Sequence, residues 1–126
     1  MSTGVGVGDA TGFTPKKTGT VLMMMTSSMS NNTANDGFQD AIFYNTTGLP
    51  LNGTGVGSDT IVATAQIPSV SVAGERRVMA IVALVKGLTP GVTIYPYIAH
   101  SAITGGTATT TGLAATIITC IELTST

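Results

Sequence analysis

The apolar residues of this chain come in short blocks, and each block is bounded by Gly, Pro, Asn or Ser. Blocks of this length are typical of β-strands, whereas an amphipathic helix needs a longer stretch with a period of 3.6 residues. Strands are predicted at residues 20–27, 38–45, 60–67, 77–86, 92–99 and 116–124, with shorter ones at 69–73 and 107–111. About eight strands separated by regular turn signals predict an all-β chain that folds as an antiparallel β-sandwich or jelly roll.

The run from Val78 to Val85 differs from the other predicted strands because apolar residues occupy every position. A buried helix can also be apolar all round, but the β-branched residues of this run and the turn signals at Gly74 and Gly87 favour a strand. A strand that does not alternate normally has both faces covered. We therefore expect the core to cover one face of this strand, and a partner or an arm of the chain to cover the other.

The first 18 residues differ in composition from the rest of the chain. Residues 4–8 read Gly-Val-Gly-Val-Gly, which is the composition of a flexible tail. Their glycine spacing is also that of a phosphate-binding loop, but such a loop needs a strand before it and a helix after it. We expect an extended N-terminal arm over residues 1–18, lying on its own domain or on a neighbouring subunit, followed by a jelly-roll domain over residues 19–126.

The composition is rich in apolar residues and poor in charge. Charged residues make up 9% of the chain, against about 25% in a typical globular domain, and 43% of the residues are hydrophobic. The longest apolar run is far shorter than the roughly 20 residues of a membrane-spanning helix. The apolar excess is therefore expected to be buried in protein, partly in subunit interfaces. With five Lys and Arg residues and a net charge of −1, the chain lacks the basic surface that nucleic-acid binding requires.

The residue types that carry catalysis or bind metals are scarce. Cys120 and His100 are the only residues of their types, and Cys120 lies in a predicted strand, where a buried structural thiol is more common than a nucleophile. Asp36 and Asp40 could approach each other, but a sugar-cleaving carboxylate pair needs a cleft that is usually lined by aromatic residues, and the chain has no Trp. We predict no enzyme activity, no cofactor and no metal site.

The chain shows no sign of an export step. A single cysteine excludes an intrachain disulfide, and the N-terminal residues lack the basic and apolar regions of a secretory signal. We therefore expect the protein to be made and used without export.

Eight residues are candidates for contacts with a partner. They comprise apolar residues of the arm, the two lysines that follow them, and the charge cluster before the long apolar run. This cluster suits an intersubunit salt bridge, and a solvated turn is an equal alternative. The candidates are Val5, Val7, Phe13, Lys16, Lys17, Glu75, Arg76 and Arg77.

The last third of the chain has a distinctive order of features. A strand ends in Gly-Leu-Thr-Pro-Gly at residues 87–91, a second strand covers residues 92–99, a glycine turn lies at residues 105–109, and a last strand covers residues 117–123. This order resembles the closing strands of TNF/C1q-like jelly rolls found in bacteriophage structural proteins, including head-decoration (cement) proteins and fibre tips, over residues 78–123. The resemblance implies trimers on the outer capsid surface that bridge major capsid proteins. The Met23-Met24-Met25 block and a last strand without aromatic residues depart from the family pattern.

Composition and resemblance favour a virion structural protein, a capsid decoration (cement) subunit made in the host cytoplasm. Its partners would be the major capsid protein and copies of itself, with no nucleic acid and no membrane. An alternative is a receptor- or glycan-binding fibre or spike tip that reads sugars with the loops at residues 28–37 and 46–59. A third possibility, a bacterial C1q-like secreted protein, requires an export route.

Overall fold

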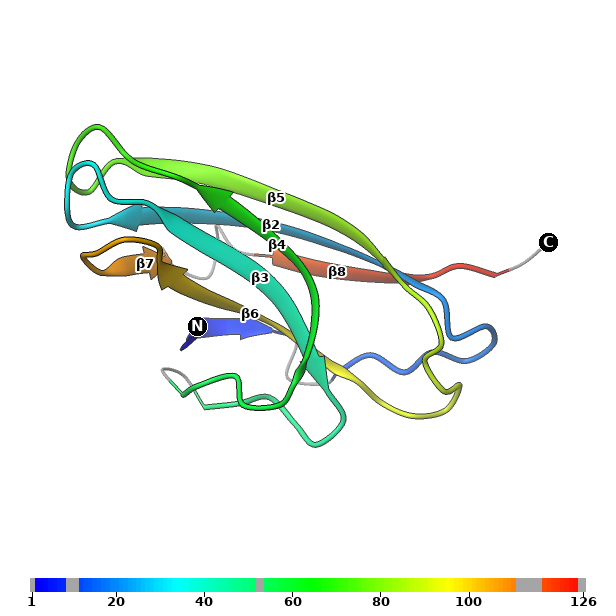
Figure 1. The fold of residues 1–126 in the computed structure, drawn as a ribbon. Coiled ribbons are helices and arrows are strands. Elements are labelled where there is room, and N and C mark those ends of the chain that lie inside the picture. Colours follow the sequence, from blue (N-terminus) through cyan, green and yellow to red (C-terminus); the bar gives the residue numbers. More distant parts are fainter. Residues whose placement is uncertain (1, 9–11, 52–53, 111–116, 125–126) are drawn as a thin grey trace.

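The computed structural model describes residues 2–8, 12–51, 54–110 and 117–124, and within these ranges the chain is all-β without a helix (Figure 1). The strands are β1 (Ser2–Gly8), β2 (Val21–Asn31), β3 (Phe38–Asn45), β4 (Thr60–Ile67), β5 (Arg76–Val85), β6 (Tyr95–Ala102), β7 (Ala108–Thr110) and β8 (Ile117–Glu122). They form two antiparallel sheets, an arrangement consistent with a β-sandwich, and this confirms the predicted all-β class. No described helix is long and apolar enough to cross a membrane.

Each sheet combines strands from distant parts of the chain. The first sheet runs β1-β6-β3-β4, and the second places β5 on one side of β2 with β7 and β8 along the other side. β2 pairs with β5 while β3 pairs with β6, so the chain passes repeatedly between the sheets. Such crossing connections are typical of sandwiches with Greek-key connections.

The core lies between the sheets, and the alternation of buried residues is clearest in β2. In β2, Val21, Met23 and Met25 are buried, and the residues between them are not. They pack against Ile42 of β3 and Ile81 of β5. A second cluster around Phe38 and Met29 continues the core toward the other end of the sandwich.

A loop covers the outer face of the first sheet. Phe43 and Tyr97 stack on this face with ring centroids 5.8 Å apart. Leu49 and Val56, from the loop between β3 and β4, pack on the same cluster. This sheet is therefore shielded on both faces at its centre.

Several element boundaries differ from the predicted ones. The segment at residues 69–73 is not a strand but a turn, in which Val70 is buried and is held by backbone hydrogen bonds to Asn35 and Asp36. β6 starts at Tyr95 rather than Val92, because the N–H of Val92 closes a turn onto the carbonyl of Thr89. Residues 2–8 of the expected arm form β1, which pairs with β6 of the same chain.

Candidate interaction surface

β5 presents an apolar row to solvent. Met79 and Ile81 point into the core, whereas Val78 and Val82 are 77% and 68% exposed, and Leu84 is also exposed. The prediction that both faces of this run are covered does not hold for the single chain. Because the residues on both faces of β5 are apolar, the sequence alone does not show which of them point into the core.

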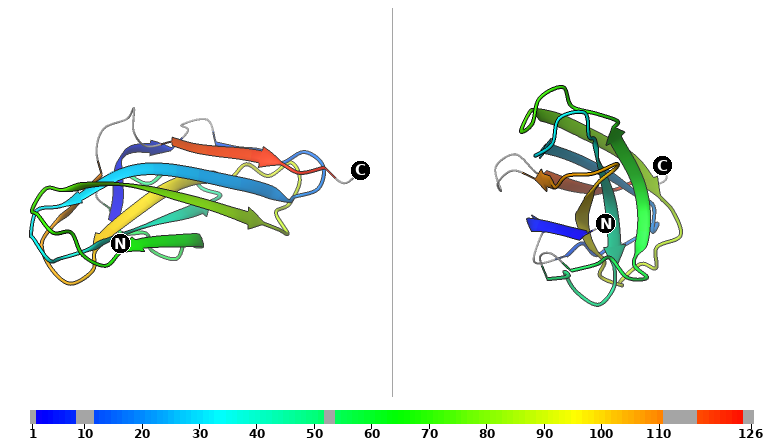
Figure 2. Two further views of the ribbon diagram at one scale, coloured as in Figure 1. Left: turned by 90° about the horizontal axis from the view of Figure 1, so that it is seen from above. Right: turned by 60° about the vertical axis from the view of Figure 1, so that its left-hand side comes forward.

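β2 and β8 extend this row into a continuous surface. Leu22 of β2 lies opposite Leu84 of β5 on one side and Ile121 of β8 on the other. One step along, Met24 lies between Val82 and Thr119. The left view of Figure 2 shows β5, β2 and β8 running side by side. We call the apolar residues on the outward side of these strands the apolar face; its members are Leu22, Met24, Val78, Ala80, Val82, Leu84, Ile117 and Ile121. Thr26, Ser28 and Thr119 lie on the same side and interrupt it.

The exposed residues of the apolar face are neighbours in three paired strands and are not scattered over the surface. Single exposed apolar side chains are normal, but a contiguous patch of several hundred Å² on a soluble domain usually marks an interaction site. Here, Ile117 and Ile121 of β8 add to the exposed residues of β5, while the half-buried Met24 fills the space between the two rows. The arrangement suits contact with protein and contains no group that could do chemistry.

The described carboxylates are all engaged within the chain. Asp36 accepts a hydrogen bond from Thr104, Asp40 accepts one from Ser27, and Asp59 accepts them from Asn45 and Tyr97. Glu75 pairs with Arg77, and Glu122 binds backbone N–H groups. No further carboxylate remains in the described part of the chain to neutralise its other cations.

Those cations lie at the ends of the apolar face. Arg76 begins β5 and Lys86 follows its last residue, and strand alternation puts both on the side of Val82. Lys16 and Lys17 lie beside Glu122, at the end of β8. None of the four forms an ion pair with a described carboxylate. The face therefore has an apolar centre and a basic rim.

The structure places the predicted contact residues as follows. Val5 and Val7 lie in β1, but their side chains fall outside what the structure describes. Phe13 is half-buried against the core and bridges Ile94 by two backbone hydrogen bonds of 2.7 and 2.8 Å. Lys16 and Lys17 are exposed, as are Arg76 and Arg77. The sequence predicts a partner or an arm on the second face of residues 78–85, but it does not identify the residues of that face, and it does not predict the outward residues of β2 and β8.

Glu122 fastens the start of the chain to its last strand. Its carboxylate accepts hydrogen bonds from the backbone N–H groups of Lys16, Lys17 and Thr18 at 2.8, 2.7 and 2.8 Å, and from Gly19 at 3.4 Å. Successive N–H groups of this kind form an anion-binding nest. These hydrogen bonds, that of Lys16 foremost, lower the pKa of Glu122 to about 2.

A second carboxylate is buried between the sheets. Asp40 is fully buried and accepts a hydrogen bond from the Ser27 hydroxyl, while its Oδ1 has no partner among the described residues. Burial raises the pKa of Asp40 to about 6, and the Ser27 hydrogen bond opposes this shift only in part. His100 lies opposite Asp40 on the neighbouring strand, and burial lowers its pKa. Asp40 and Ser27 are both buried, so they offer no site for a substrate.

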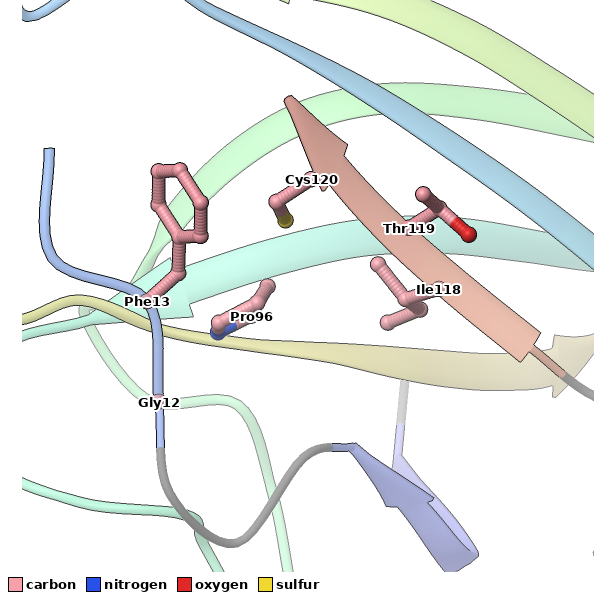
Figure 3. Close-up of a pocket in the computed structure, with 6 residues that line it drawn as sticks. All are labelled: Gly12, Phe13, Pro96, Ile118, Thr119 and Cys120. Carbon is pink, nitrogen blue, oxygen red and sulfur yellow. The ribbon is translucent and has the colours of Figure 1, made fainter. Parts of the chain in front are cut away.

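The surface hollows of the described part of the chain include two with different linings. One, of about 230 Å³, lies between β8, β6 and the segment at Gly12, and Phe13, Pro96, Ile118 and Cys120 line it (Figure 3). The other, of about 240 Å³, is polar, and its lining includes Tyr44, Asn45, Thr47 and Asp59. Among the described residues, no three His, Cys, Asp or Glu side chains come close enough to hold a metal ion.

No family model, curated protein or solved structure matches this chain. No function can therefore be transferred to this chain from a relative.

Proposed function

We propose that this chain is a structural subunit that attaches to a larger protein assembly through the apolar face. The observation that carries the proposal is the exposure of Val78, Val82 and Leu84 on a strand whose alternate residues build the core. Each Å² of apolar surface removed from water contributes about 25 cal/mol. A surface of this kind stabilises an assembly when a neighbour covers it.

The assembly we propose is a virus capsid, with the chain as a decoration (cement) subunit on its outer surface that bridges major capsid proteins. The resemblance of residues 78–123 to phage structural proteins supports this, and it assigns the sandwich to the jelly-roll type. The 9% share of charged residues also suits a chain that functions within an assembly. The action is mechanical: many modest contacts, repeated over many copies, add up to strong attachment.

The proposal is tested on particles purified from the source that encodes this chain. Quantitative mass spectrometry should find the chain at a copy number comparable to that of the major capsid protein. Particles stripped of the chain should rebind it when the purified protein is added back. Absence of the chain from the particles would contradict the proposal.

Two matched variants then test the apolar face. Val82→Lys puts a charge in the centre of the face, and Val72→Lys puts the same charge at an exposed valine in a turn outside it. We expect the first variant to fold but to lose rebinding, and the second to rebind as the parent does. Equal rebinding of both variants would remove the face from the proposal.

A second candidate is glycan binding, which the polar hollow favours. The lining includes an aromatic residue, Tyr44, and the polar residues Asn45 and Asp59. Asp59 Oδ2 is already engaged by Tyr97 and Asn45, which holds the carboxylate in place. Binding to a glycan array by the parent, together with its loss in Tyr44→Ala, would support this candidate. An array without signal would exclude it for the sugars tested.

A further inference from the structure

β5 lies at the edge of the second sheet. Among the described strands it pairs only with β2, and Figure 1 shows it along the upper rim of the molecule. No backbone hydrogen bond joins its other side to a described segment. β4 of the first sheet lies near this edge without pairing with β5. The N–H and C=O groups on that side therefore have no backbone partner in the described chain, and another strand would pair with them.

This edge lacks the features that usually prevent strand addition. Natural edges are kept short, bulged, or interrupted by charge or proline. β5 has ten residues, pairs with β2 without a register shift, and carries neither charge nor proline between Val78 and Val85. Its charges lie at the ends, in Arg76, Arg77 and Lys86.

The end charges determine which strand fits. Arg76 and Lys86 share the outward face with Val82, and no described carboxylate pairs with either of them. In the two-fold register centred on Ile81, a second copy of β5 would bring its own Lys86 opposite Arg76. Like charges directly opposite each other are destabilising. Carboxylates at these two positions would be attracted instead.

We propose that β5 is a strand-addition site for an extended segment of a partner protein that is apolar at alternate positions and acidic at both ends. Main-chain hydrogen bonds supply affinity in this mode, and alternate side chains supply specificity. The inserted strand would widen the apolar face by one row. This inference rests on the proposed function, because it specifies the chemistry of the partner that an assembly-forming subunit recognises.

The geometry defines a peptide probe. From Arg76 to Lys86 the strand advances ten residues, or about 34 Å. An antiparallel peptide with the sequence Glu-Thr-Val-Thr-Val-Thr-Val-Thr-Val-Thr-Glu, blocked at both termini, places its acids opposite Arg76 and Lys86. Its valines then lie opposite Val78, Ala80, Val82 and Leu84. A control peptide carries Lys in place of both Glu residues, and a second control has N-methyl groups along the pairing edge.

Binding of the labelled peptides to the full chain is measured by fluorescence anisotropy at low and high salt. We expect the Glu peptide to bind about fivefold more tightly than the Lys peptide at low salt, the effect of two exposed ion pairs. The difference should vanish at high salt and in the Arg76→Gln/Lys86→Gln double variant. The N-methyl peptide should not bind, because it cannot form the main-chain hydrogen bonds.

Equal affinity for the Glu and Lys peptides, or no binding of either, would overturn the proposal. Sedimentation velocity of the chain alone provides a third decisive result. If it dimerises and the Glu peptide prevents dimerisation, the occupant of the edge is a second copy instead. The rebinding of stripped particles is independent of these outcomes. Failure of the peptide with intact rebinding therefore rejects only the strand-addition site.

Discussion

The carboxylate of Glu122 accepts a hydrogen bond of 2.7 Å from the backbone N–H of Lys17, a residue 105 positions earlier in the chain. Neighbouring N–H groups share the same carboxylate, so the segment before β2 is fastened to β8 at the basic end of the apolar face. We call this set of hydrogen bonds the clasp. It could not be inferred from the sequence, because its donors are backbone N–H groups and not particular side chains.

Glu122→Gln should lower the melting temperature at pH 7 and remove part of its pH dependence. The pKa of Glu122 is lowered from 4.5 to about 2, so the folded chain binds this proton less readily than the unfolded chain. The stabilisation is therefore complete above about pH 4.5 and is lost as the pH falls toward 2. Thermal unfolding followed by circular dichroism at pH 7, 4 and 2.5 measures this. Parent and variant should converge at the lowest pH.

The control for the clasp is the Lys16→Gln/Lys17→Gln double variant. Because Glu122 binds the backbone N–H groups of these residues and neither side chain forms an ion pair with it, the melting temperature should stay near that of the parent. A loss as large as that of Glu122→Gln would mean that side-chain charge, and not the nest, provides the stabilisation.

Asp40 should have the opposite pH dependence. Its pKa is raised from 3.8 to about 6, so the folded chain holds the proton more tightly, and stability falls as the pH rises from about 4 to about 6. A shift of this size corresponds to a loss on the order of 3 kcal/mol. Together with the Glu122 effect, this favours greatest stability near pH 4. The lowered pKa of His100 acts in the opposite direction, because the folded chain binds that proton less readily.

Asp40→Asn tests this interpretation because it removes the titrating proton and keeps the shape. Urea unfolding of the variant should lack the fall in stability between pH 4 and 6, and the lowered pKa of His100 should leave a rise instead. At pH 7 the variant should exceed the parent by about 1–2 kcal/mol, the removed charge penalty less the cost of an unpaired buried amide. A variant whose stability depends on pH as that of the parent does would show that Asp40 is not charged within the core.

Replacing exposed valines of the apolar face with threonine should reduce the exposed apolar surface without changing the fold. Val78→Thr/Val82→Thr should reduce the fluorescence of the dye ANS, which reports exposed apolar surface, and should shift the urea midpoint little. Val72→Thr, at an exposed valine in the turn before β5, is the matched control and should leave the dye signal unchanged. Equal dye binding by all three proteins would mean that the face is covered in solution.

The sequence predicted a strand correctly where turn residues mark both of its ends, and it failed where no such local signal exists. β3 and β4 have the predicted boundaries because turn residues bound both blocks. β1 was not predicted as a strand, because Gly4, Gly6 and Gly8 have no side chains to show alternation. The apolar face was missed for the reverse reason: in β5 both faces are apolar, so the sequence could not distinguish the core side from the solvent side.

The three consecutive methionines of β2 give the sharpest test of that distinction, because two neighbours of identical chemistry point in opposite directions. Met23 is fully buried in the core, and Met24 is half-buried on the apolar face beside Val82. Met23→Ala should cost about 2–5 kcal/mol of unfolding free energy, because it leaves a cavity. Met24→Ala should cost less than about 1 kcal/mol in the isolated chain, since its surroundings can collapse or admit water.

The same Met24→Ala should weaken rebinding to stripped particles, where a partner would bury the face. Urea unfolding and the rebinding measurement, made on both variants, separate the two roles. If both variants lost stability equally and neither affected rebinding, Met24 would belong to the core and not to the interaction surface.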